Sequence, residues 1–251
     1  MLYIVGIGPG NEKYFTKECY ETLKNVDLIV CYKGYEKYVK NFNKEIYTTG
    51  MKKEIERVEY ALENAKTKNV ALVSSGDATI YGLASLAYEI NYKKNYNVDI
   101  KVISGITAAT ICSSILGAPL NHDFAVISLS DLLTPLDTIL NRLKYALLGD
   151  FILCIYNPLS RSRREPFLKF VDILKDHCES NNINLPIGIV KNAGREGESY
   201  IITNVGDIAN NLEDYMERID MNTTLIVGNS NTVVVDNRII TPRGYLKKYL
   251  I

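Results

Sequence analysis

The feature that most constrains this chain is a repeated unit, in which a short apolar run enters a turn of small residues and leaves it as a helical pattern. Its fullest example comprises the apolar run Val70–Val73, the turn 74–82 and the helical pattern Leu83–Ile90. The turn carries one acid, Asp77. Such a turn at the carboxyl edge of a sheet suits a polar ligand, although Asp77 or Ser75 would equally serve to cap the following helix.

The same unit recurs along the chain. Apolar runs predict strands at Leu2–Ile7, Asp27–Cys31, Val98–Ile103, Phe124–Leu129, Phe151–Ile155, Pro186–Val190, Tyr200–Thr203 and Thr223–Val227. Helical spacing predicts helices at Tyr14–Asn25, Lys52–Lys66 and Pro135–Leu148. Strands that alternate with helices favour a mostly parallel sheet covered by helices. The sequence therefore predicts an α/β protein whose ligand-binding turns gather at one sheet edge.

A break in this alternation predicts two domains. The segment Gly117–Asp123 contains no strand or helix pattern and carries glycine, proline and asparagine. Such segments mark domain boundaries, so we expect one α/β domain at 1–118 and a second at 119–251. Near the end of the chain, Asn231–Ile240 predicts a hairpin that turns at Asp236 and Asn237.

Composition excludes several classes of protein. Lys+Arg and Asp+Glu each number 29, so no overall field favours nucleic acid or an anionic membrane as partner. The five cysteines are widely spaced and form no Cys-x-x-Cys pair, which predicts reduced thiols without disulfides or metal. No apolar stretch reaches membrane-spanning length and no signal-like leader is present, so we expect a cytoplasmic protein.

The first turn imitates a dinucleotide-binding motif but departs from it. It reads Gly6-Ile7-Gly8-Pro9-Gly10, and Asn11 occupies the position where that motif has its third glycine. Pro9 also removes a backbone donor that would hold a pyrophosphate, and the next strand ends without the acid that binds a ribose. These departures disfavour a nicotinamide or flavin enzyme, whereas the turn still indicates close approach to a ligand.

Four turns taken together resemble the tetrapyrrole (corrin and porphyrin) methylases, which use S-adenosylmethionine. They are Gly6–Gly10, Ser75–Asp77, Gly105–Ala108 and Asn192–Ala193. Longer segments, including 121–135, 192–196 and 241–245, are similar to the cobalamin-pathway members that methylate C-17 of precorrin-3B or cobalt-precorrin-3 and contract the ring. Asn11, Ala78 and Ser104 depart from the family pattern. Some relatives carry a cysteine-rich iron–sulfur segment that this chain lacks, so no metal or cluster is expected.

The resemblance implies two α/β domains with an active-site cleft between them, a precorrin substrate and a homodimer. The residues that it implies for binding S-adenosylmethionine are Gly8, Pro9, Ser75, Gly76, Asp77, Ile80, Thr107, Ala108, Tyr156, Asn192 and Ala193. For the glycines the alternative is turn geometry alone. For Ile80 and Ala193 packing explains the residue nearly as well as ligand contact.

The chemistry of the expected reaction suggests further residues. Ring contraction requires a macrocycle hydroxyl to lose a proton, and the candidate bases are His122, Asp131 and Asp77. His122 could equally make a structural hydrogen bond between the domains, and Asp131 could equally organise a turn.

The substrate carries acetate and propionate arms, which guanidinium groups bind well. Candidate clamps are Arg161, Arg163, Arg195 and Arg243. Arg161 and Arg163 could alternatively lie on a solvated helix start, although cations at that end oppose the helix dipole.

The sequence thus leads us to expect a C-17 methyltransferase of cobalamin biosynthesis. Two alternatives stay open: another methylase of the same pathway, and a non-catalytic protein that binds S-adenosylmethionine or a tetrapyrrole.

Overall fold

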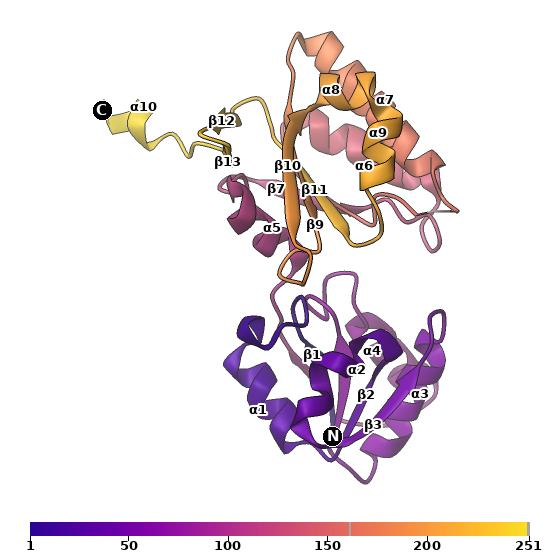
Figure 1. Ribbon diagram of the computed structural model, residues 1–251. Helices are drawn as coiled ribbons and strands as arrows, with labels where there is room; N and C mark the ends of the chain where they lie inside the picture. The colour runs from indigo at the N-terminus through magenta and orange to yellow at the C-terminus, as the bar shows by residue number, and fades with distance from the viewer. Residues whose placement is uncertain (161, 250–251) are drawn as a thin grey trace. The chain divides into compact units, whose positions relative to one another are not determined.

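The chain folds into two compact units, Met1–Ala108 and Ala109–Ile251, each built around one five-stranded sheet. Figure 1 shows this computed structural model, which describes residues 1–160 and 162–249. Arg161, an expected substrate clamp, lies outside the described residues. The α/β class with parallel and mixed sheets is confirmed.

The first unit is a wholly parallel sheet with helices on both faces (Figure 1). In spatial order its strands are β3 (Glu45–Thr49), β2 (Leu28–Tyr32), β4 (Val70–Ser74), β1 (Leu2–Gly6) and β5 (Ile100–Ile103). Its α-helices are α1 (Lys17–Asn25), α2 (Glu36–Val39), α3 (Glu54–Ala65) and α4 (Ala84–Lys93). The helices α3 and α4 cover one face, and α1 and α2 cover the other. Because both faces of the sheet are covered, its three central strands β2, β4 and β1 are nearly continuous apolar runs.

The second unit has a mixed sheet. In spatial order its strands are β10 (Ser199–Asn204), β9 (Pro186–Lys191), β11 (Thr223–Val227), β8 (Ile152–Tyr156) and β7 (Phe124–Ser128). The strand β7 is parallel to β8, and β11 is antiparallel to both β8 and β9. Therefore β7, β8 and β9 all end at the same edge, where β11 begins.

Helices cover both faces of this second sheet. The helices α6 (Leu136–Leu148), α7 (Glu165–Asn181), α8 (Val205–Asn210) and α9 (Leu212–Arg218) pack on one face. On the other face lies α5 (Ala108–Leu116). A smaller sheet joins β12 (Val233–Val235), β13 (Arg238–Ile240) and β6 (Gly117–Ala118), and the short helix α10 (Tyr245–Tyr249) follows it.

The expected division at 118/119 differs from the observed one, because α5 packs with the second unit. Its Ala109, Cys112 and Leu116 lie in one apolar cluster with Ile152 and Cys154 of β8. The turn-rich segment Gly117–Asp123 therefore follows the first helix of the second unit rather than separating the two units.

The structure also bears on the predicted hairpin and on the cysteines. The hairpin is confirmed, with Asp236 and Asn237 at positive φ in its turn. The five cysteines are free and buried. Burial raises the pKa of Cys112 to about 12, so this thiol stays protonated at neutral pH. Among the described residues, no helix combines the length and apolar character needed to span a bilayer.

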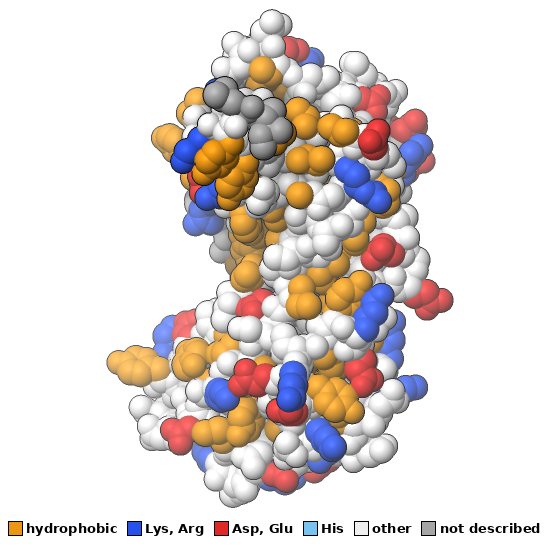
Figure 2. Space-filling view, turned by 90° about the vertical axis from the view of Figure 1, so that its left-hand side faces the viewer, with side chains coloured by type: hydrophobic (Ala, Val, Ile, Leu, Met, Phe, Trp, Pro, Cys, Tyr) orange, Lys and Arg blue, Asp and Glu red, His pale blue; other side chains and the backbone are white. Residues whose placement is uncertain are grey.

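Charged side chains of both signs mix over the face of each unit seen in Figure 2, without a broad area of one sign. This distribution agrees with the balance of acidic and basic residues in the sequence.

Three turns of the first unit meet at its carboxyl edge, because β4, β1 and β5 are neighbours. A Cβ atom on Gly6 would lie 2.7 Å from the Gly76 carbonyl oxygen and 2.8 Å from the Gly105 nitrogen. A Cβ atom on Gly105 would lie 2.5 Å from the Gly6 carbonyl oxygen. The backbones therefore approach more closely than any side chain permits.

This contact predicts that Gly105→Ala destabilises the first unit. We expect a loss of about 1–3 kcal/mol in unfolding free energy, because the obstructing atoms belong to backbone that cannot rotate away. Denaturant unfolding of the purified variant measures it. The matched control is Gly50→Ala, where a Cβ atom would meet nothing within 4 Å. Equal stability of the two variants would contradict the close-packing argument.

Candidate functional site

The turns after β1 and β4 are joined by paired backbone hydrogen bonds. The Gly8 amide donates to the Gly76 carbonyl at 3.1 Å, and the Gly76 amide donates to the Gly8 carbonyl at 2.8 Å. Both residues have positive φ, 58° and 65°, which glycine adopts without strain. A Cβ atom on Gly76 would meet only the Thr107 Cα, at 3.9 Å. The turn is thus fixed in place and has free space beside Gly76.

Asp77 connects this turn to the turn after β5. Its Oδ1 accepts from the Thr79 amide at 2.8 Å and from Thr79 Oγ1 at 2.5 Å. Its Oδ2 accepts from the Gly105 amide at 3.0 Å. Asp77 does not cap the following helix, because α4 begins at Ala84 and has no side-chain cap. The carboxylate holds two turns together.

These contacts decide the charge of Asp77. Burial by itself raises the pKa of Asp77, but hydrogen bonds from Thr79, Gly105 and Ser104 together outweigh it and hold this pKa below the ordinary value. The group is therefore ionised at neutral pH. As a proton acceptor in catalysis it is poorly suited, since both oxygens already accept hydrogen bonds.

The other expected cofactor residues of the first unit lie on the same three turns. Pro9 is buried, Ser75, Thr107 and Ala108 are half-buried, and Ile80 is exposed. Tyr35 was not found from the sequence, and its hydroxyl donates to Ser75 Oγ at 2.8 Å. It follows β2, the neighbour of β4, so adjacency in space rather than a motif brings it to this edge.

The carboxyl edge of the second unit carries a second group of expected residues. The hydroxyl of Tyr156, at the end of β8, accepts from the Ala109 amide at 2.7 Å. Asn192, after β9, has a positive φ of 52°, and its amide donates to the Asn222 carbonyl at 3.0 Å. Ala193 is partly buried against the apolar cluster that contains Ala109.

Arg163 and Asp131, expected in separate roles, lie side by side at this edge. Arg163 Nε lies 3.4 Å from Asp131 Oδ1, and one terminal nitrogen donates to Ser130 Oγ at 3.2 Å. The other terminal nitrogen donates to the Asn157 carbonyl at 3.4 Å. Only 12% of the Arg163 side chain is exposed. The Arg163 guanidinium is thus largely engaged within the protein, whereas 34% of the Asp131 side chain is exposed.

The remaining candidates fall at different places. Arg195 is half-buried on the turn after β9, where its amide donates to the Asn192 carbonyl at 2.8 Å. Arg243 is exposed on the segment between β13 and α10, which is not one of the turns that follow β7, β8 and β9.

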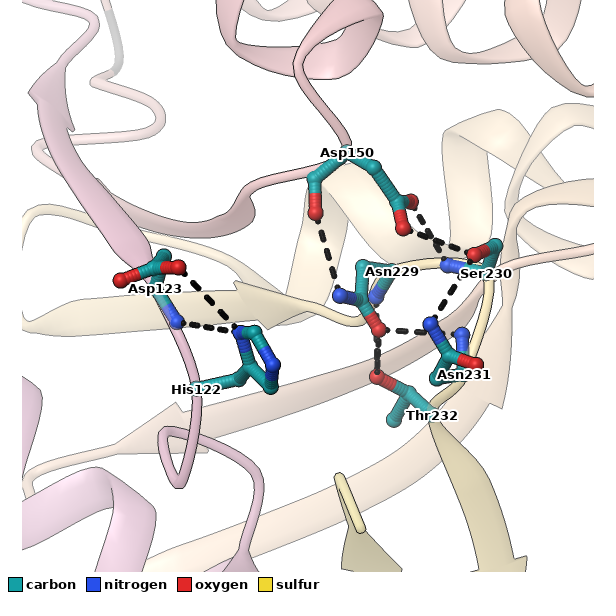
Figure 3. Close-up of polar contacts among 7 residues, drawn as sticks. All are labelled: His122, Asp123, Asp150, Asn229, Ser230, Asn231 and Thr232. Atoms are coloured by element: carbon teal, nitrogen blue, oxygen red, sulfur yellow. Dashed lines mark hydrogen bonds and ion pairs between the residues drawn. The ribbon is translucent and has the colours of Figure 1, made fainter. Parts of the chain in front are cut away.

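His122 lies at the opposite edge of the second sheet from Asp131, because one precedes β7 and the other follows it. Its Nδ1 accepts from the Asp123 amide at 2.9 Å, and the Asp123 carbonyl accepts from the amide of Ile152, the first residue of β8. Figure 3 shows His122 and Asp123 beside the contacts of Asp150 with Asn229 and Ser230. The structure therefore does not bring His122 together with Tyr156, Asn192 or Asp131.

The hydrogen bonds of Asp77 predict a pH-dependent stability. Asp77→Asn replaces an acceptor oxygen by a donor, so we expect a loss of about 1–3 kcal/mol in unfolding free energy at pH 7. Because the folded-state pKa is lowered, this stabilisation is present above the ordinary carboxyl pKa of about 4 and is lost as the pH falls through the folded-state value.

Urea unfolding between pH 7 and pH 3 measures the unfolding free energy of wild type and variant. The difference between the two should become smaller as the pH falls. The exposed Asp176 offers a control, since Asp176→Asn should change little at any pH. If the difference in unfolding free energy between wild type and Asp77→Asn stays constant with pH, the ionised Asp77 carboxylate is not the source of the stabilisation.

The sequence of this chain matches a known protein family and several curated relatives. The family model described as Tetrapyrrole (Corrin/Porphyrin) Methylases matches residues 1–209. A curated relative from Methanocaldococcus jannaschii, named "Probable cobalt-factor III C(17)-methyltransferase", is 65% identical over 251 residues, which are 100% of each chain.

Solved structures of other methyltransferases are similar to this chain. That of "the methyltransferase CobJ" has 31% sequence identity and a TM-score of 0.87, covering 96% of this chain and 99% of the other. A uroporphyrin-III C-methyl transferase from Thermus thermophilus, "complexed with S-adenyl homocysteine", has 20% identity and a TM-score of 0.65, covering 90% and 91%. The second likeness shows a shared fold. With the family match over most of its length, this chain belongs to the tetrapyrrole (corrin/porphyrin) methylases.

Proposed function

We propose that this protein is an S-adenosylmethionine-dependent methyltransferase that methylates C-17 of cobalt-factor III or precorrin-3B in cobalamin biosynthesis. The observation that carries the proposal is the 65% identity, over the whole of both chains, to a relative bearing a C(17)-methyltransferase name. The turns at the carboxyl edges of the two sheets supply the chemistry-bearing residues. We further propose that the protein acts as a homodimer in the cytoplasm.

The first unit offers a place that fits the cofactor. Gly76 leaves free space on its outer side, and the half-buried Ser75 and Thr107 adjoin it. We assign cofactor binding in this unit to Gly8, Pro9, Ser75, Gly76, Asp77, Ile80, Thr107 and Ala108. The rigid pairing of Gly8 with Gly76 orders these backbone groups before a ligand arrives, which lowers the cost of binding.

In the second unit, we assign adenosine contacts to Tyr156, Asn192 and Ala193. Tyr156 is held by the Ala109 amide and Asn192 by its backbone bond to Asn222, so both have fixed positions. Arg195 is the arginine best placed to bind a substrate carboxylate, since it lies on the same turn as Asn192. Arg243 is less favourably placed.

The reaction needs little general acid–base chemistry for methyl transfer itself. S-adenosylmethionine supplies an electrophilic methyl group when bound, and the protein's task is to hold donor and acceptor in line. For ring contraction, Asp131 is a better-placed base than His122, because it shares an edge with Tyr156 and Asn192.

A methyl-transfer assay tests the proposal. The purified protein is incubated with methyl-labelled S-adenosylmethionine and, in parallel, with cobalt-factor III and precorrin-3B. We expect label at C-17 of at least one macrocycle, with S-adenosylhomocysteine as the second product. A reaction inhibited by added S-adenosylhomocysteine serves as the control.

The other outcomes separate the alternatives. Label at a different ring carbon would indicate another methylase of the pathway. Binding of S-adenosylmethionine without methyl transfer to either macrocycle would indicate a non-catalytic binding protein. Either result contradicts the proposed function.

A further inference from the structure

Two adjacent leucines on the loop between β7 and α6 lie almost wholly in solvent. Leu132 is 73% exposed and Leu133 is 98% exposed. Neither residue contributes to the apolar clusters of the second unit. Neighbouring apolar side chains exposed in this way commonly mark a surface that contacts a ligand or partner.

The base of this loop is firmly held although its tip is exposed. The Ser130 amide donates to Ser128 Oγ at 3.2 Å, and Arg163 binds both Ser130 and Asp131. Arg163 is anchored in turn on the Asn157 carbonyl, at the end of the neighbouring strand. The two leucines are therefore presented at a defined position.

This position is the carboxyl edge to which the proposed function assigns Tyr156 and Asn192. Ser128 accepts from Asn157 Nδ2 at 3.0 Å, which ties the end of β7 to the end of β8. Met221, 45% exposed, lies on the same edge with its sulfur 3.7 Å from Arg163. Apolar side chains thus border a group of polar ones, as in sites that bind a ligand with an apolar body and polar arms.

We propose that Leu132 and Leu133 contact the apolar face of the tetrapyrrole macrocycle and that Arg163 positions their loop. This inference rests on the proposed function, because that function supplies the macrocycle. A macrocycle is a broad apolar surface with carboxylates at its rim, so a rigid pair of leucines at the site edge removes apolar area from water when it binds. Arg163 is a positioning residue, because its guanidinium is bound to Ser130, Asp131 and Asn157.

Steady-state kinetics with cobalt-factor III as the varied substrate test the leucines. Leu133→Ser and Leu132→Ser should each raise KM for cobalt-factor III roughly tenfold, since a few methylenes of apolar contact are worth that much. KM for S-adenosylmethionine and the melting temperature should stay unchanged, because these side chains pack against nothing in the core.

Leu148→Ser is the matched control. Leu148 is 75% exposed and ends α6, at the opposite edge of the same sheet, so its loss should leave both KM values unchanged. Unchanged KM for cobalt-factor III in the loop variants would overturn the inference. A changed oligomeric state with unchanged KM would also overturn it, in favour of self-association through the loop.

The positioning role makes a second demand. Arg163→Ala should raise KM for cobalt-factor III about as much as Leu133→Ser, and the double variant should be no worse than either alone. Arg163→Lys is the second variant, to be used if the alanine variant folds poorly. It keeps the charge, and we expect it to give a KM for cobalt-factor III between those of wild type and Arg163→Ala. The control is Arg164→Ala, whose exposed guanidinium pairs with Glu213 on α9. Fully additive KM effects would show that Arg163 does not act through the loop.

These outcomes are distinct from failure of the proposed function. Wild-type protein that transfers no methyl group to any tetrapyrrole contradicts the function itself, and the inference with it. Wild-type protein that is active, with loop variants of unaltered KM, contradicts only the inference.

Discussion

The contact on which the rest of the first unit depends is the meeting of three backbone turns at Gly6, Gly76 and Gly105. No side chain fits between these three backbones, so the ends of β4, β1 and β5 are fixed relative to one another. Asp77 then ties the outer two turns, with its charge balanced by amide and hydroxyl donors rather than by a cation. If the proposed function is taken as given, such fixed backbone would help to align the methyl donor, and alignment supplies much of the rate.

Sequence patterns predicted every strand of the two five-stranded sheets except the edge strand β3. The strands β1, β4, β8 and β11 are buried on both faces and are therefore continuous apolar runs. The edge strand β3 was missed, since Glu-Ile-Tyr-Thr-Thr is only partly buried and carries no such run. The turn-rich segment Gly117–Asp123 indicated a boundary, but the apolar face of α5 determines the observed one.

Motifs within one turn were recognisable, whereas contacts between turns were not. Ser75 was identified from its turn, but its partner Tyr35 lies 40 residues earlier and follows a neighbouring strand. Arg163 and Asp131 were assigned separate roles, because nothing in the sequence shows that the ends of β7 and β8 lie together. Strand order, which follows from tertiary packing, decides such pairs. His122 and Asp131 show the converse, since they are close in sequence and separated by the length of β7.

Both units have left-handed backbone in the turns that follow their strands, but different residue types adopt it. Both reverse the chain soon after parallel strands by means of left-handed backbone, at Gly8 and Gly76 in one unit and at Asn157 and Asn192 in the other. In the first unit the turns are locked to each other by backbone hydrogen bonds. In the second, asparagine tolerates left-handed backbone and its amide adds a hydrogen bond, from Asn157 to Ser128 and from Asn192 to Gly197. Glycine thus serves where backbones must approach closely. Asparagine serves where a side chain has room: Asn157 ties the turn after β8 to the end of β7, and Asn192 bonds within its own turn.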